Sequence, residues 1–337
     1  MGNQSSRIIE KTKKSRPVKQ VRRRSTLSHR SAPATISFRP DRRPSASGMI
    51  PTPGHHHIKR RKPSSVKSPE DLREWDRLQR QHYLLKNARG TNCCAMDKME
   101  TIPETILDVD TGNGIWAFEM AIEYPCSRVI GLGHRSVPEQ AGRPSNLEYI
   151  QGDINQTWAI PSGSVDLIFQ RAMGPTMTTE QWAHVLSENT RVLKPGGYIE
   201  WVECDVMHHR PGPIQQAFDQ YIQQEWETKH MDFFYTDTFD QLITGQATME
   251  LKDHMTWDIP IGEWHDEIHG KQLGFINQDV QKASYRNKKP YYTTAWAMDS
   301  EEYDAAVQAL LLEFEDYKSF SRFHCWLAKK SIDPSSP

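Results

Sequence analysis

Short apolar runs alternate with helix-like segments between residues 105 and 204, and this alternation restricts the fold more than any other feature of the chain. The runs with the length and composition of buried strands are 105–109, 128–132, 147–151, 165–170 and 198–204. Segments 116–124 and 179–193 have helical periodicity instead. Strands that alternate with helices form a parallel sheet with helices on both faces. We therefore expect a doubly wound α/β fold, with its ligand site at the carboxyl ends of the strands.

The sequence on both sides extends this domain to residues 69–330. Ser68, Pro69, Glu70 and Asp71 have the pattern of a capped helix start, and Gly90 ends the segment that follows. Beyond the fifth strand we expect helices at 215–229 and 301–318, strands at 251–257 and 322–328, and a loop-rich stretch at 258–300. Two strands around the last helix predict a mostly parallel sheet with one antiparallel edge strand.

Residues 1–68 have a different composition from the rest of the chain. They hold 18 Lys/Arg and 2 Asp/Glu, whereas residues 69–337 hold 24 and 41. Segment 1–68 is also rich in Ser and Pro and has Phe38 as its one aromatic residue, so we expect a disordered basic arm. Residues 331–337 are expected to be a disordered tail. Because the body is acidic, it is a poor candidate for docking on nucleic acid.

The start of the arm fits a lipidation signal. Residues 1–6 match the N-myristoylation pattern, with Gly2 as the acceptor, and a run of basic residues follows directly. A myristoyl chain together with a polybasic stretch would bind an anionic membrane surface. Nuclear import through the basic run at 59–62 is the alternative use of the arm.

Several classes of protein are excluded by what the sequence lacks. No stretch approaches 18 apolar residues, and the first 30 residues have no signal-peptide core. Five scattered cysteines without a CxxC pair argue against a disulfide framework or a zinc module, so we predict no metal site. We expect an intracellular protein, cytoplasmic and membrane-associated through its N-terminus, with the nucleus as the alternative.

The segment most informative about function is residues 106–116, with the sequence ILDVDTGNGIW. A strand that ends in an acid, a glycine-rich turn and a following helix form the layout of a nucleotide-binding loop. Glycines in such a turn let the backbone approach a ligand closely. Two glycines at this spacing are weak support alone, so the order of the later motifs matters.

Taken together, 106–116, Val129-Ile130-Gly131, QGDI at 151–154, SVDLI at 164–168 and LKPGGYIE at 193–200 resemble the Rossmann-like (class I) S-adenosylmethionine-dependent methyltransferases, most closely the fungal LaeA-like group. The resemblance covers about residues 70–330. It implies S-adenosylmethionine as the cofactor and an unidentified small molecule or protein as the methyl acceptor. By analogy with this fold, 207–249 is expected to form a lid.

The resemblance also implies roles for particular residues. Asp108, Gly112, Asn113 and Gly114 match the loop that holds the amino-acid end of the cofactor. Asp153 matches the acid that accepts from the adenine amino group, with Ile154 beside the ring. Gln170 and Arg171 end the fourth strand, where the methyl group would face its acceptor. No catalytic residue can be named.

The sequence departs from the family pattern at two positions. Asp110 stands where the first glycine of the loop is usual, and Gly133 stands where an acid after the second strand normally binds the ribose hydroxyls. These departures leave a second hypothesis open, a degenerate methyltransferase-like protein with a regulatory or binding role and little catalysis. A nicotinamide-dependent oxidoreductase is disfavoured because the GxGxxG pattern is missing.

Overall fold

Within the described part of the chain, seven strands form one sheet in the order β3-β2-β1-β4-β5-β7-β6. The strands are β1 (Thr105–Val109), β2 (Arg128–Gly133), β3 (Leu147–Gln151), β4 (Val165–Arg171), β5 (Leu193–Cys204), β6 (Met249–Pro260) and β7 (Phe320–Lys330). Neighbours from β3 to β5 pair in parallel. Strand β7 runs antiparallel to both β5 and β6. The predicted fold class is therefore confirmed, with the antiparallel strand one position in from the edge.

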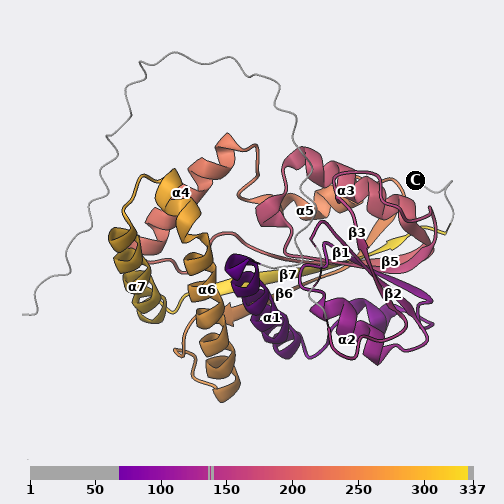
Figure 1. Cartoon of the computed structure of the whole chain (residues 1–337), viewed down its shortest axis with the longest axis horizontal. Coiled ribbons are helices and arrows are strands. Elements are labelled where there is room, and N and C mark those ends of the chain that lie inside the picture. The colour runs from indigo at the N-terminus through magenta and orange to yellow at the C-terminus, as the bar shows by residue number, and fades with distance from the viewer. Residues whose placement is uncertain (1–67, 136, 138–139, 333–337) are drawn as a thin grey trace, which may run out of the picture. The chain divides into compact units, whose positions relative to one another are not determined.

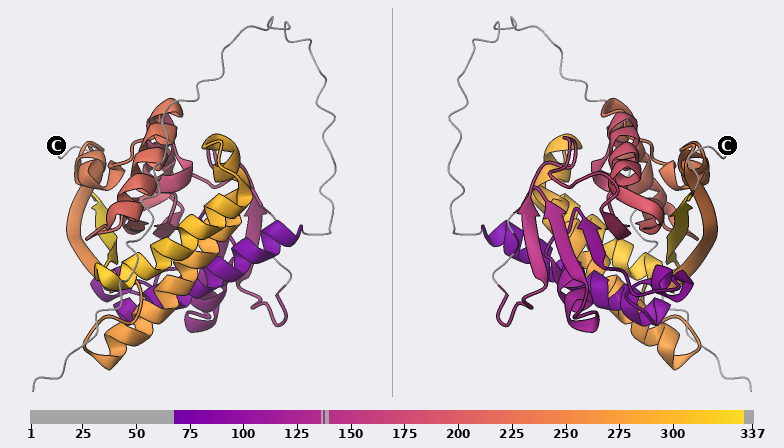
Figure 2. Two further views of the ribbon diagram at one scale, coloured as in Figure 1. Left: turned by 90° about the vertical axis from the view of Figure 1, so that its left-hand side faces the viewer. Right: turned by 90° about the vertical axis from the view of Figure 1, so that its right-hand side faces the viewer.

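The helices cover both faces of this sheet. They are α1 (Pro69–Arg89), α2 (Ile115–Glu123), α3 (Thr179–Val192), α4 (Pro213–Thr228), α5 (Tyr235–Thr244), α6 (Ile268–Ala295) and α7 (Ser300–Asp316), with short 3-10 turns at Cys94–Lys98 and Gly174–Thr176. Helices α3 and α5 lie on one side of the sheet and α2 on the other, while α4, α6 and α7 gather near one end of the sheet (Figures 1 and 2).

Two apolar clusters hold these layers together, one on each face. Trp201 and Phe239 belong to the cluster under α3 and α5. Trp116, stacked on Phe169 at 3.9 Å between ring centroids, belongs to the cluster under α1 and α2. Because successive strand residues point to opposite faces, a β-strand buried on both sides reads as the continuous apolar run seen in the sequence.

The prediction that residues 258–300 are loop-rich is wrong. Helix α6 fills most of this stretch, with Pro290 inside it. Gly270, Gly274 and Pro290 disfavour a helix when judged by propensity alone. The structure gives the reason for one of them: a Cβ on Gly274 would lie 1.8 Å from the Gly262 carbonyl oxygen, so only glycine allows this approach.

The segment 207–249, expected to form a lid, has two parts. Its second part, α5, is core: Phe239 and Ile243 are fully buried, and Tyr235 donates from its hydroxyl to the Glu203 carboxylate (3.0 Å). This part therefore covers a sheet face and is not a lid. Closure of the first part, which contains α4, over an acceptor stays a prediction.

The structure, a computed structural model, describes residues 68–135, 137 and 140–332. The predictions for the arm at 1–67, Gly2 included, and for residues 333–337 fall outside the described residues. No helix in the described part of the chain is both long enough and apolar enough to cross a membrane.

Candidate functional site

The glycine-rich loop connects the carboxyl end of β1 to α2, next to the point where the strand order reverses between β1 and β4. Asp108 is 4% exposed at the end of β1, and the Thr111 hydroxyl donates to its carboxylate at 2.6 Å. Thr111 also donates its backbone N–H to the Leu132 carbonyl (2.9 Å), which ties the loop to β2. The loop is thus held on both sides at the edge where ligands bind in sheets of this kind.

Three residues of the loop have left-handed backbone conformations. Gly112 and Gly114 have φ of 59° and 76°, and Asp110 has φ of 53°. Glycine adopts these angles without steric cost, and aspartate tolerates them better than most residues. Asp110 therefore has a backbone conformation that glycine adopts without strain.

Helix α1 packs against this loop. Ser68 caps the helix with Asp71, and Gly90 ends it with φ of 73°, as the sequence predicts. Leu78 lies 3.5 Å from the position that a Cβ on Gly112 would take. Asn113 donates from Nδ2 to the Trp75 carbonyl oxygen (3.1 Å). The loop residues Gly112 and Asn113 are consequently positioned by α1 as well as by the sheet.

The carboxyl ends of β2 and β3 lie beside the loop. Gly152 donates its N–H to the Gly133 carbonyl (2.9 Å), so Asp153 directly follows a residue paired with the end of β2. Asp153 is exposed and accepts from the backbone N–H of Asn155 (2.9 Å), whereas Ile154 is buried. A cavity of about 230 Å³ lies here, lined by Thr111, Gly131, Gly133, Arg135, Val137, Arg143, Tyr149, Ile150 and Gln151.

The two residues at the end of β4 point to opposite faces. Gln170 is fully buried, and its Oε1 accepts from Asn189 of α3 (3.0 Å), so the structure does not bring its side chain to the loop. Arg171 faces α1, where it donates to His82 Nδ1 (3.3 Å). Burial lowers the pKa of Arg171 to about 10, and the nearby Asp108 carboxylate opposes that shift. Of Gln170 and Arg171, only Arg171 has its side chain near the loop, where it interacts with the Asp108 charge.

Sequence reasoning missed the side chains that support these groups. Thr111 carries no signal beyond being a hydroxyl in the loop, and His134 follows Gly133 without any recognisable motif. His82 is buried on α1, where burial lowers its pKa to about 4, and it bridges Arg171 to Glu119 (3.1 Å). Such partners depend on tertiary packing, which local patterns do not report.

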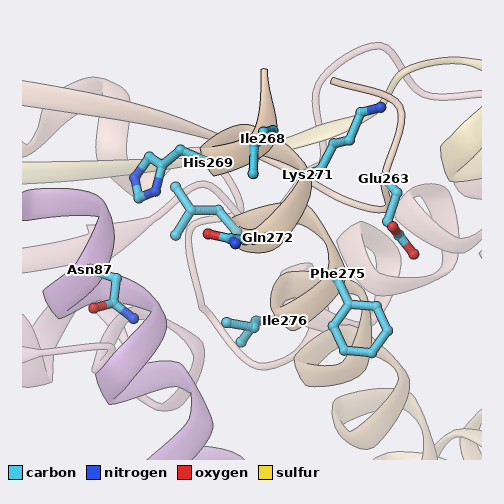
Figure 3. A pocket seen from close by; sticks show the side chains of 9 residues that line it. Asn87, Glu263, Ile268, His269, Lys271, Gln272, Phe275 and Ile276 are labelled. Carbon is cyan, nitrogen blue, oxygen red and sulfur yellow. The ribbon is translucent and has the colours of Figure 1, made fainter. Parts of the chain in front are cut away.

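A second, larger pocket of about 790 Å³ lies away from the loop. Its lining residues are Asn87, Glu263, Ile268, His269, Lys271, Gln272, Leu273, Phe275 and Ile276. Figure 3 shows Asn87 of α1 across this pocket from side chains of α6. Asn87 comes nine residues after Leu78, or about 13 Å along a helix that rises 1.5 Å per residue. None of the predicted cofactor residues lines this pocket.

One buried group of side chains in the described residues has the composition of a metal site. One ligand atom from each of Cys94, Glu200 and Cys325 lies within 4.8 Å of the others. The guanidinium of Arg89 already pairs with the Glu200 carboxylate and donates to Cys94 Sγ (3.1 Å). Because a cation of the protein itself neutralises this carboxylate, the group is a structural ion pair.

Asp108 gives a pH-dependent prediction. Burial raises the pKa of its carboxyl to about 7, opposed by the hydrogen bond from Thr111. The unfolded chain releases this proton near pH 4. Between about pH 4 and 7 the folded state binds the extra proton, so its free energy of unfolding falls as the pH rises through this window. Replacing Asp108 with asparagine removes the effect.

Urea unfolding of the native chain and of Asp108→Asn, measured from pH 4 to pH 8, tests this prediction. We expect the stability of the native chain relative to the variant to decrease with pH by a few kcal/mol and then level off above about pH 7. A difference that stays constant over the whole range would contradict the assignment.

Comparison with known proteins agrees with this geometry. The family described as "Methyltransferase domain" matches residues 106–197, which run from β1 into β5. Methyltransferase pytC of Aspergillus terreus is 28% identical over 147 residues, which cover 43% of this chain and 44% of that protein. Protein-methionine methyltransferase laeA of Emericella nidulans is 29% identical over 214 residues, covering 61% and 55%. The chain spans about half the length of the curated relatives it matches.

Among solved structures, a phosphoethanolamine N-methyltransferase of Haemonchus contortus in complex with S-adenosyl-L-methionine is similar, with a TM-score of 0.45 and 14% identity over 79% of this chain and 61% of that chain. Residues 106–197 thus match the methyltransferase domain family. The chain is similar in sequence to class I methyltransferases of the LaeA-like group.

Proposed function

We propose that this chain is an S-adenosylmethionine-dependent methyltransferase that acts on a small-molecule or protein acceptor. The observation that carries the proposal is the position of the 108–114 loop. It lies at the carboxyl end of β1, beside the switch point of the sheet, and inside the segment that matches the methyltransferase family. The match also supports S-adenosylmethionine as the cofactor.

The residues around the loop fit such a cofactor. Gly112 and Gly114 keep side chains away from the loop backbone. The N–H of Gly114 is used within the loop, where it donates to the Thr111 carbonyl oxygen (2.8 Å). Asp153 offers an acceptor-only carboxylate, which suits an exocyclic amine, and Ile154 supplies apolar surface next to it. These assignments are predictions from the sequence. The packing of α1, β2 and β3 around the loop supports them.

The chemistry asks little of the protein beyond positioning. The bound cofactor supplies an activated methyl group on a sulfonium, so alignment with the acceptor can carry most of the rate enhancement. The side chains of this chain therefore hold the nucleoside, orient the acceptor and exclude water. A dedicated nucleophile is not needed, which agrees with the absence of a recognisable catalytic motif from the sequence.

The alternative of a degenerate regulatory protein rests on Asp110 and Gly133 alone. The comparisons do not support it, and Asp110 has the left-handed backbone conformation that glycine adopts freely. The curated relatives are described as methyltransferases and as regulators of secondary metabolism. Those descriptions apply to the relatives. For this chain, a small-molecule or protein methyl acceptor is part of our proposal.

Ultraviolet cross-linking with methyl-tritiated S-adenosylmethionine tests this function. We expect label on the native chain, and we expect S-adenosylhomocysteine to compete for it while NAD does not. Competition by NAD but not by S-adenosylhomocysteine would instead favour an oxidoreductase. Absence of label on folded protein would count against the methyltransferase proposal.

For the arm, we propose myristoylation at Gly2 and binding to an anionic membrane through the basic residues that follow. This places the protein in the cytoplasm at a membrane surface. We expect Gly2→Ala to move the protein from the membrane to the soluble fraction, since one polybasic stretch without its acyl chain binds weakly. If both forms fractionate alike, nuclear use of the arm becomes the better explanation.

A further inference from the structure

The two positions that depart from the family pattern lie side by side. Asp110 Oδ1 is 3.6 Å from the position that a Cβ on Gly133 would take. Residue 110 directly follows β1 and residue 133 ends β2, and these strands pair in parallel with Val109 opposite Leu132. The left-handed φ of Asp110 belongs to the turn that aims its side chain at the neighbouring strand. A carboxylate thus stands where a side chain at position 133 would begin.

The Asp110 carboxylate is partly buried and has few polar partners. Its side chain is 25% exposed, and the one ion-pair partner within the described residues is His134, with Nδ1 3.6 Å from Oδ1. The hydrogen bond with Asp110 raises the pKa of His134, and Asp153 raises it further, while partial burial and Arg135 oppose the shift. A carboxylate accepts several hydrogen bonds, so the acceptor sites that His134 does not use can accept from a ligand.

We propose that Asp110 binds the ribose hydroxyls of the cofactor and replaces the carboxylate that position 133 lacks. This inference rests on the proposed function. Two vicinal hydroxyls donate to the two oxygens of one carboxylate, a charge-assisted contact stronger than a neutral hydrogen bond. Asp110 is therefore a positioning residue for the nucleoside, and Gly133 is the position that leaves room for it.

The proposal has a consequence for Gly133. An aspartate at this position would restore the family motif, but its carboxylate would crowd that of Asp110. Two carboxylates in one site disfavour each other's charged form and compete for the same hydroxyls. The structure therefore predicts that Gly133→Asp weakens binding in the native chain and strengthens it when residue 110 is glycine.

Calorimetric titration of S-adenosylhomocysteine into the full chain tests both statements. Asp110→Asn keeps a residue that tolerates the left-handed turn and removes the charge. We expect it to weaken binding about 10- to 150-fold, the range for a lost charge-assisted hydrogen bond. Gly133→Asp should also weaken binding, and the double variant Asp110→Gly with Gly133→Asp should recover most of the affinity. Glu148→Gln, in an exposed ion pair with Arg128, is a charge-removing control expected to bind like the native chain.

An analogue without the 2′-hydroxyl identifies the contact. The native chain should bind it more weakly than S-adenosylhomocysteine, whereas Asp110→Asn should discriminate little between the two. Equal discrimination by both proteins would overturn the ribose assignment, even if Asp110→Asn binds weakly, because Asp110 would then contact another part of the ligand. Native-like affinity in Asp110→Asn would overturn it as well. A folded native chain that binds neither ligand would refute the proposed function, and this inference with it.

Discussion

Replacing Glu200 with glutamine should lower the free energy of unfolding by about 3–5 kcal/mol. Glu200 is fully buried in β5, and the Arg89 side chain that pairs with it is 1% exposed. Its carboxylate also accepts from the Ala95 backbone N–H (2.8 Å). Glutamine keeps the volume of the side chain but leaves the Arg89 charge buried without its counter-ion. Chemical denaturation of both proteins measures the difference.

Glu104→Gln is the matched control for this experiment. Glu104 makes an ion pair with Lys194 (3.4 Å), but its side chain is 87% exposed. Because exposed ion pairs contribute between zero and about 1 kcal/mol, the same chemical change should have little effect there. Similar costs for the two variants would mean that the Arg89–Glu200 pair is not the buried structural element described above.

Gly112→Arg should weaken the binding of S-adenosylmethionine by about 100-fold or more. Gly112 has φ of 59°, and its Cβ position already lies 3.5 Å from Leu78 of α1. An arginine there must either displace α1 or project into the edge of the sheet where the loop faces its ligand. The affinity of the variant, measured by titration calorimetry, reports the loss.

Gly163→Arg separates this local effect from the cost of the backbone conformation. Gly163 has a nearly identical φ of 60°, but a Cβ there has no neighbour within 4 Å. Both variants therefore carry the strain of a left-handed arginine, but only Gly112→Arg also brings a side chain against Leu78. We expect Gly163→Arg to bind like the native chain. If both variants bind equally well, the cofactor loop has been misplaced.

The sequence predicts β1, β2 and β4 well because these strands are short, largely buried apolar runs. The α1 boundaries were predictable for a similar reason, since Ser68 and Gly90 act through local capping. Helix α6 was not, because Gly274 and Pro290 disfavour a helix locally and the packing against Gly262 that requires glycine is non-local. In this segment, tertiary packing outweighs the low helix propensity of the local sequence.

In the candidate site, too, local features could be predicted from the sequence and non-local contacts could not. The loop residues from Asp108 to Gly114 lie in one contiguous segment, so their common location follows from the chain itself. The proximity of Asp110 to Gly133 depends on the left-handed turn at residue 110 and on the register between β1 and β2. Viewed as separate departures, these two residues suggest a lost site. In the structure, the Asp110 carboxylate lies next to the position that a side chain on Gly133 would occupy.

The most direct test of the account is a calorimetric titration of S-adenosylmethionine and S-adenosylhomocysteine into the full-length native chain. We predict saturable binding of each ligand at one site, with loss of both in Gly112→Arg. Absence of binding in a natively folded sample would contradict the central claim that the 108–114 loop holds this cofactor.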